Sequence, residues 1–125
     1  MFSKRPGSFM RHEASYLKDI LRAAEKLEAI TAASSEATFI SDEVLPAAVL
    51  HHLTVIGEAI NRLSPALRER HPEVPWRQIV SVRHRIVHAY FDLDLQIVWT
   101  AAADEIPRLR EQIARILAHE FPESG

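Results

Sequence analysis

Apolar residues recur along most of the chain at intervals of three and four, the spacing of one face of an α-helix. This pattern predicts a first helix from about His12 to Thr31, and a second helix capped at its start by Ser41 or Asp42. The apolar faces of these helices consist of Leu17, Ile20, Leu21, Ala24 and Leu27, and of Leu45, Val49, Leu53, Ile56, Ile60 and Leu63. Residues 33–41, which include SSEAT, are predicted to connect them.

Prolines indicate where the next two helices begin. Ser64 followed by Pro65 is typical of an N-cap and a first helical residue, and predicts a short helix with the sequence PALRER. Pro75 precedes a further helix, which is predicted to extend from about Trp76 to Tyr90.

The last helix is expected to begin after Asp92 or Asp94 and to extend to His119. Its predicted apolar face consists of Val98, Ala102, Ile106, Leu109, Ile113 and Leu117. Four long helices and one short helix, joined by brief connections, predict an all-α fold, an up-and-down helical bundle.

Length and composition are those of one globular domain. The chain has 125 residues, of which 47% are apolar and 26% are charged. This length is enough for a single hydrophobic core. We therefore expect a flexible lead-in over residues 1–10, one domain over residues 11–120 and a short tail over residues 121–125.

Composition also excludes several classes of function. The chain contains no cysteine, so it has no disulfide framework, thiolate metal site or cysteine nucleophile. No apolar segment approaches the roughly 18 residues of a membrane span, and no apolar signal core follows the basic start, so we predict a cytoplasmic protein without a membrane segment. With a net charge of −2, a nucleic-acid substrate would require a local basic site.

The segment 83-RHRIVHAY-90 concentrates polar and titratable groups within an otherwise apolar helix. On an ideal helix, with about 100° between residues, Arg83 lies at the centre of the apolar arc. The residues within about 60° of Arg83 are Trp76, Ile79, Val80, Ile86, Val87 and Tyr90. The opposite, polar arc contains Arg77, Ser81, His84, Arg85 and His88.

An arginine at the centre of an apolar face needs a partner, because an unpaired buried charge is unfavourable by several kcal/mol. One explanation is a structural ion pair with Glu58 of the second helix, although Glu58 can also pair locally with Arg62. The other explanation is that this face lines a cleft or meets a partner subunit, where Arg83 binds an anion.

His88 lies about 140° from Arg83 on an ideal helix, so the two do not share a face. They would meet if the helix distorts or ends near His88, or if a second protomer completes the site. His84 and His88 have the spacing of a helical metal site, but no third ligand is nearby in the sequence, and we predict no metal. His84 is equally explained as a solvated residue. Of His51 and His52, one is expected to be half-buried and the other exposed.

If they converge, Arg83 and His88 suit the cleavage of RNA without a metal ion. Histidine titrates near neutrality and can act as general base or acid on a ribose 2′-OH. Arginine can donate charge-assisted hydrogen bonds to the phosphate as negative charge develops. The 2′-OH is itself the nucleophile, so no protein nucleophile is required.

These residues resemble a known family. The segment 83-RHRIVHAY-90 fits the R-x4-H-x-Y signature of the HepT-like toxins of the HEPN superfamily, with Arg83, His88 and Tyr90 at the three motif positions. The flanking phrases 16-YLKDILRA-23, 55-VIGEAINRLSPALRERHPEVPWRQI-79 and 90-YFDLDLQIVWTAAADEIPRLREQI-113 are similar as well. His84 stands where the family often has Asn, and Ala89 where Gly is frequent.

The resemblance implies a HEPN-like homodimer in which Arg83 and His88 line a cleft at the dimer interface and act as a metal-independent endoribonuclease, supported by His84 and Glu58. No cofactor is implied. It also implies the toxin role in a type VII-like toxin–antitoxin system, with a cognate MntA-like nucleotidyltransferase antitoxin that transfers AMP to Tyr90. A bulky anionic group beside Arg83 would compete with the RNA phosphate.

Two other functions fit the same residues. The chain can be a non-catalytic docking subunit for a nucleotidyltransferase, in which Arg83 binds a nucleotide phosphate and Tyr90 is the modified group. It can also be a purely structural bundle, although an arginine at the centre of the apolar arc argues against this.

Overall fold

The computed structural model describes residues 6–88 and 95–124, with side chains described for residues 12–82 and 95–123. Every regular element in these ranges is helical, which confirms the predicted all-α class. The helices are α1 (Pro6–Ala32), α2 (Glu36–Ser41), α3 (Leu45–Arg62), α4 (Pro65–Arg70), α5 (Trp76–His88), α6 (Leu95–Thr100) and α7 (Ile106–Glu120). A π-helical turn, η1 (Ala101–Glu105), joins α6 to α7, and a 3₁₀ turn, η2 (Pro122–Ser124), follows α7.

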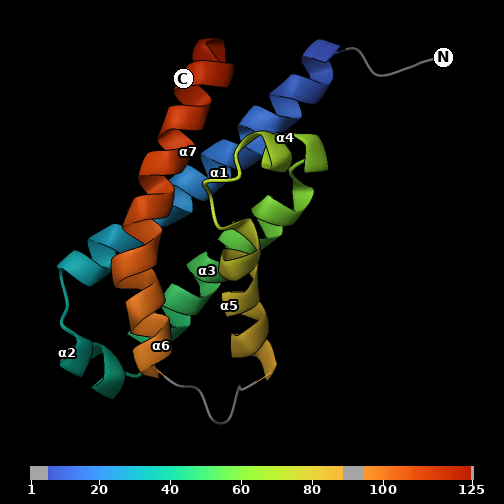
Figure 1. Cartoon of the computed structure of the whole chain (residues 1–125). Coiled ribbons are helices and arrows are strands. Elements are labelled where there is room, and N and C mark those ends of the chain that lie inside the picture. The colour runs from blue at the N-terminus through green and yellow to red at the C-terminus, as the bar shows by residue number, and fades with distance from the viewer. Residues whose placement is uncertain (1–5, 89–94, 125) are drawn as a thin grey trace.

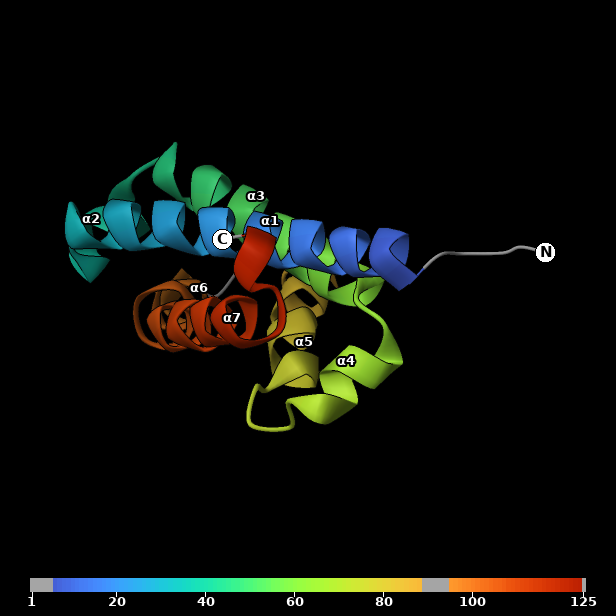
Figure 2. The same cartoon turned by 90° about the horizontal axis from the view of Figure 1, so that it is seen from above.

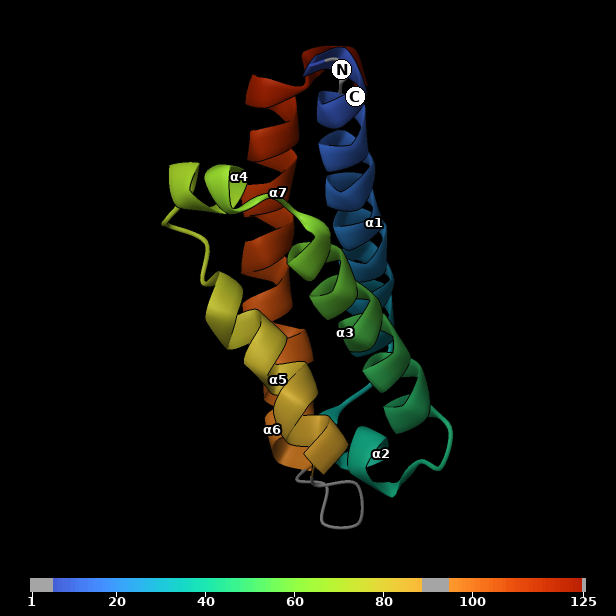
Figure 3. The same cartoon turned by 90° about the vertical axis from the view of Figure 1, so that its right-hand side faces the viewer.

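The helices form a two-layered bundle. Helix α1 packs against both α3 and α7, while α5 packs against α3 (Figure 1). Seen from above, α1, α2 and α3 form one layer, and α5, α6 and α7 form the other (Figure 2). Helix α4 projects from the side of the bundle, and the start of α1 lies at the same end as the end of α7 (Figure 3).

The apolar faces predicted from the sequence form the core. Of the six apolar positions predicted for the second helix, Leu45 is half-buried and the other five, up to Leu63 just after α3, are buried. All six predicted positions of the last helix are buried as well. The hydrophobic periodicity therefore identified the faces by which the long helices pack together.

The predicted cap of the short helix is confirmed, because Ser64 Oγ accepts a hydrogen bond from Leu67 N at 3.1 Å and caps α4. The cap predicted before α3 is not, because the N-cap residue of this helix is Val44, which has no capping side chain. Asp42 follows α2 and its Oδ1 accepts from Val44 N at 2.7 Å and from Leu45 N at 2.9 Å, so it still satisfies the first N–H of α3. The caps expected for the last helix, Asp92 and Asp94, lie outside the described residues.

The N-terminal half of the bundle departs from the sequence prediction in two places. Helix α1 begins at Pro6 rather than near His12, so half of the predicted lead-in belongs to this helix. The predicted connection over residues 33–41 contains α2, which Ser35 caps by accepting from Thr38 N at 3.1 Å. Phe39 of α2 is buried against the core, which explains why this short helix is stable there.

The C-terminal part differs as well. The predicted last helix contains the π turn, because Pro107 has no N–H to donate to the carbonyl of Ala103, and Ile106 N–H instead donates to Ala101 O. The tail predicted from residue 121 begins in the core, since the Phe121 side chain is only 7% exposed.

Candidate active site

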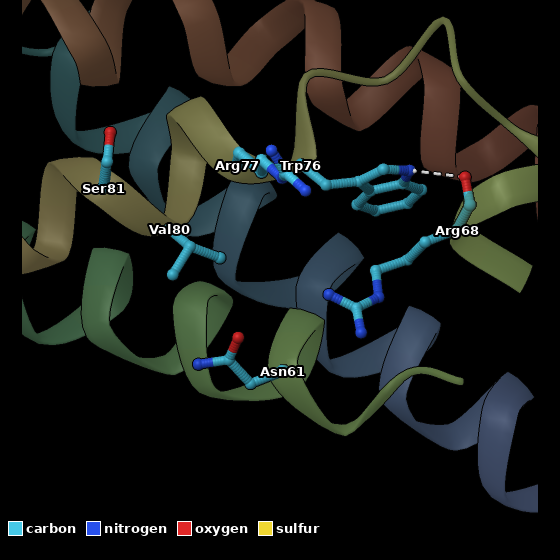
Figure 4. A pocket seen from close by; sticks show the side chains of 6 residues that line it. All are labelled: Asn61, Arg68, Trp76, Arg77, Val80 and Ser81. Carbon is cyan, nitrogen blue, oxygen red and sulfur yellow. Dashed lines mark hydrogen bonds between the residues drawn. The ribbon is translucent and has the colours of Figure 1, made fainter. Parts of the chain in front are cut away.

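Helix α5 carries most of the motif, and a tryptophan at its first residue fixes its start. The indole Nε1–H of Trp76 donates to the carbonyl of Arg68 at 3.1 Å (Figure 4). It also donates to the carbonyl of His71 at 3.0 Å. Because these carbonyls belong to the end of α4 and the loop after it, Trp76 holds α4 and the start of α5 together.

The end of α4 and the loop after it are joined to α7 by charged groups. The guanidinium of Arg70 donates to both carboxylate oxygens of Glu120, at 2.7 Å from Nη2 and 3.4 Å from Nε. His71 Nε2 also contacts this carboxylate. The hydrogen bond from Arg70, with a smaller effect from His71, lowers the pKa of Glu120 below its ordinary value. The loop that precedes α5 is thus attached to the end of the bundle.

The buried face of α5 is rotated from the one predicted. Val82, which the angular count left outside the apolar arc, is 4% exposed, whereas Val80 is only half-buried. The buried side chains of this helix are Trp76, Ile79 and Val82. The centre of the face that they form lies at Ile79, which is about 40° around the helix axis from position 83. Position 83 therefore lies toward the Val80 edge of this face and not at its centre.

Three of the expected site residues share one helix, but their side chains lie outside the described part of the chain. Arg83, His84 and His88 belong to α5, and His88 is its last residue. Tyr90 lies in the segment 89–94, which is not described. How Arg83 and His88 meet, by a distorted helix or across two protomers, therefore stays a prediction.

Glu58, the other expected supporting residue, lies on α3 with its side chain exposed to solvent. The local alternative partner, Arg62, is exposed too, and the ion pairs of the described residues do not include one between them.

A pocket of about 320 Å³ opens beside the motif, along the polar side of α5. It is lined by Asn61 of α3, Arg68 of α4, and Trp76, Arg77, Val80 and Ser81 of α5 (Figure 4). Arg77 and Ser81 are exposed, as the angular count predicted. On a helix, positions 77, 81, 84 and 88 follow one strip at intervals of four, three and four, so positions 84 and 88 continue the strip of α5 on which Arg77 and Ser81 line the pocket.

The sequence did not single out Asn61 or Arg68, although both occur in the family phrase over residues 55–79. The sequence pattern alone could not connect them, because Asn61 lies on α3 and Arg68 on α4. They come together only in the folded protein, where both line the pocket beside α5.

The two other histidines near the centre of the chain have the environments expected for them. His51 is exposed and His52 is half-buried, with ring centroids 5.2 Å apart. Burial, together with the nearby His51 and Lys26, lowers the pKa of His52.

Within the described ranges, no three or more His, Asp or Glu side chains gather in a way that would hold a metal ion. No helix in those ranges has both the length and the apolar character needed to cross a membrane.

Comparison with known proteins identifies the family. Residues 20–116 match the profile of the family described as "Ribonuclease HepT-like", and the chain belongs to this family. It is 36% identical over 111 residues to "Putative RNase TTE0752" of Caldanaerobacter subterraneus subsp. tengcongensis, covering 89% of this chain and 99% of that protein. It is 32% identical over 106 residues to "Probable ribonuclease HepT" of Thermococcus cleftensis, covering 85% of this chain and 96% of that protein. No solved structure matches the chain.

Proposed function

We propose that this protein is a metal-independent endoribonuclease whose catalytic residues are Arg83 and His88. The observation that carries the proposal is the R-x4-H-x-Y motif of a HepT-like ribonuclease family member, with Arg83 and His88 on α5. The names of the two relatives as RNases support the same reaction class.

In the proposed reaction, His88 takes the proton of a ribose 2′-OH and the 2′ oxygen attacks the adjacent phosphorus. The bond from phosphorus to the 5′ oxygen breaks, which leaves a 2′,3′-cyclic phosphate and a free 5′-hydroxyl that receives a proton. Arg83 stabilises the negative charge that develops on the phosphoryl oxygens. His84 and the exposed Glu58 act as supporting groups that orient the catalytic pair.

The proposed setting is a toxin–antitoxin pair in the cytoplasm. The protein acts as a homodimer with the Arg/His site at its interface, and a cognate nucleotidyltransferase antitoxin neutralises it by adenylylation of Tyr90. The position of Tyr90, two residues after His88, supports this control, because AMP attached there would introduce a bulky anion next to the catalytic histidine.

Cleavage of a defined RNA by the purified protein in the presence of EDTA tests the reaction. We expect fragments with 2′,3′-cyclic phosphate ends, and we expect His88→Ala to abolish them while circular dichroism still reports a helical fold. Cleavage that EDTA stops, or that His88→Ala retains, contradicts the proposal.

Incubation with the cognate nucleotidyltransferase and ATP tests the control of activity. We expect the intact mass to increase by one AMP in the wild type and not in Tyr90→Phe, together with loss of RNA cleavage. Modification of a protein that never cuts RNA would instead indicate the docking-subunit function.

A further inference from the structure

The pocket beside α5 is a basic site between three helices. None of its six lining residues is acidic, and two are arginines, Arg68 from α4 and Arg77 from α5. In Figure 4 the side chain of Arg68 extends beneath the ring of Trp76 toward the amide of Asn61. The pocket thus combines two guanidinium groups with one amide, all of which can donate hydrogen bonds to an anion, whereas the Ser81 hydroxyl on its edge donates to the carbonyl of Gln78 at 2.8 Å.

Neither arginine is neutralised by the part of the protein that the structure describes. Arg22, Arg70, Arg110 and Arg115 pair with carboxylates, whereas no ion pair among the described residues includes Arg68 or Arg77. The Nε atom of Arg68 is also buried, and no hydrogen-bond acceptor contacts it there. A buried charged donor without an acceptor is unfavourable, so the pocket favours a ligand that brings an acceptor and negative charge.

The surroundings of Trp76 indicate a phosphate rather than a nucleobase. The Trp76 side chain is only 7% exposed, so its ring forms a wall and offers no face on which a base can stack. Its Nε1–H already donates to two carbonyls. The guanidinium groups of Arg68 and Arg77 and the amide of Asn61 are donors matched to phosphate oxygens, and the bidentate geometry of arginine suits them.

The place of the pocket along α5 relates it to the motif. Ser81 and His88 are seven residues apart, which corresponds to about 10 Å along a helix. A phosphate bound in the pocket, whose lining along α5 ends at Ser81, is therefore too far from His88 to be the one that is cleaved. A single strand of RNA that follows the strip from position 77 to position 88 would bring a neighbouring phosphate to the pocket.

We infer that Asn61, Arg68 and Arg77 bind a phosphate of the RNA strand that flanks the cleaved bond. This inference rests on the proposed ribonuclease function, and it adds a site that positions the strand without taking part in the chemical step. Because the contact is to the backbone, it contributes affinity and register rather than sequence specificity.

Binding of a single-stranded DNA oligonucleotide tests the site separately from catalysis, because DNA lacks the 2′-OH and is not cut. Fluorescence anisotropy over a series of salt concentrations compares the wild type with Arg77→Gln, Arg68→Lys and Arg115→Gln. Arg77 and Arg115 are both exposed, so Arg115→Gln removes the same charge from a distant surface of α7. Arg68→Lys keeps the charge but removes the Nε–H and the guanidinium fork.

We expect Arg77→Gln and Arg68→Lys to weaken binding by about tenfold, and Arg115→Gln to change it by less than about twofold. In Arg77→Gln, the slope of log K against log salt should also decrease by about 0.7, the value for one lost phosphate contact on a single strand. If Arg68→Lys loses its helical circular dichroism signal, the binding measurements on Arg77→Gln alone decide whether the inference holds.

Equal affinities and slopes for Arg77→Gln and Arg115→Gln would overturn the inference. So would binding of AMP that depends on Arg77 when oligonucleotide binding does not, because the pocket would then be a nucleotide site. Normal RNA cleavage by His88→Ala would instead contradict the proposed function and leave these DNA measurements unaffected.

Discussion

Glu13 is a buried carboxylate that fixes the beginning of α4, the helix that carries Arg68. Its side chain is 4% exposed and accepts hydrogen bonds from Ser64 N at 3.0 Å and Ser64 Oγ at 2.6 Å. Ser64 in turn caps α4, so one serine serves both as helix cap and as a donor to a buried charge. Removal of this hydroxyl leaves the carboxylate short of one donor, which is more costly than the loss of a cap alone.

Ser35 offers a matched comparison, because it caps the six-residue α2 in the same way but lies exposed. We expect Ser64→Ala to lower the free energy of unfolding by about 2–3 kcal/mol, and Ser35→Ala to lower it by about 1 kcal/mol. Urea denaturation with unchanged m-values measures both. Equal losses would show that Glu13 does not depend on the Ser64 hydroxyl.

Glu120 makes stability depend on pH through its hydrogen bond with Arg70. Its pKa is lowered in the folded protein, so the folded chain binds this proton less tightly than the unfolded chain does. The resulting stabilisation is complete above the unfolded pKa and is lost as the pH falls through the folded pKa. We expect the wild type to lose stability relative to Glu120→Gln below about pH 5.

The size of this effect is at most about 1 kcal/mol, because the pair with Arg70 is open to solvent. Urea midpoints at a series of pH values measure it, and Glu111→Gln, which removes a more exposed carboxylate of α7, serves as the control. Parallel pH curves for the wild type and Glu120→Gln would contradict the assignment.

At the scale of elements, the two tryptophans of the chain stabilise the fold in different ways. Trp76 joins α4 to α5 through its N–H, whereas Trp99 of α6 packs its ring against Phe39 of α2, with centroids 5.4 Å apart. We expect Trp76→Phe to reduce the free energy of unfolding by about 2 kcal/mol, and Trp99→Phe by about 1 kcal/mol or less. The larger loss stays moderate because the carbonyls of Arg68 and His71 also accept backbone N–H groups.

Urea denaturation of the two variants, followed by circular dichroism, checks this difference. A loss for Trp99→Phe that equals or exceeds the loss for Trp76→Phe would show that the link between α4 and α5 contributes little to stability.

The long helices were predictable because each repeats its apolar face over several turns, as Val49, Leu53, Ile56 and Ile60 do on α3. Helix α2 was not, because six residues with one buried side chain, Phe39, cannot display a helical period. The π turn was missed because the apolar spacing continues through it, and only the missing N–H of Pro107 distinguishes it.

At the scale of the whole molecule, the sequence indicated the proposed catalytic residues but not the pocket near them. The motif was recognisable because Arg83 and His88 are close together in one segment. The basic pocket was not, because Asn61, Arg68 and Arg77 belong to three helices whose packing creates it. The rotation of the α5 face, set by the burial of Val82, likewise depends on tertiary contacts that helix periodicity does not contain.

A test of the dimer follows from the proposed site. If Arg83 of one protomer acts with His88 of the other, a heterodimer of Arg83→Ala and His88→Ala chains has one site with both residues intact and one with neither. Random reassociation of the two inactive variants then restores about a quarter of the wild-type RNase activity, because half of the dimers are mixed and each has one site. Activity assays after joint unfolding and refolding measure this recovery, and each variant refolded alone is the control. If both residues act within one protomer, every site in the mixture lacks one of them, and no activity returns.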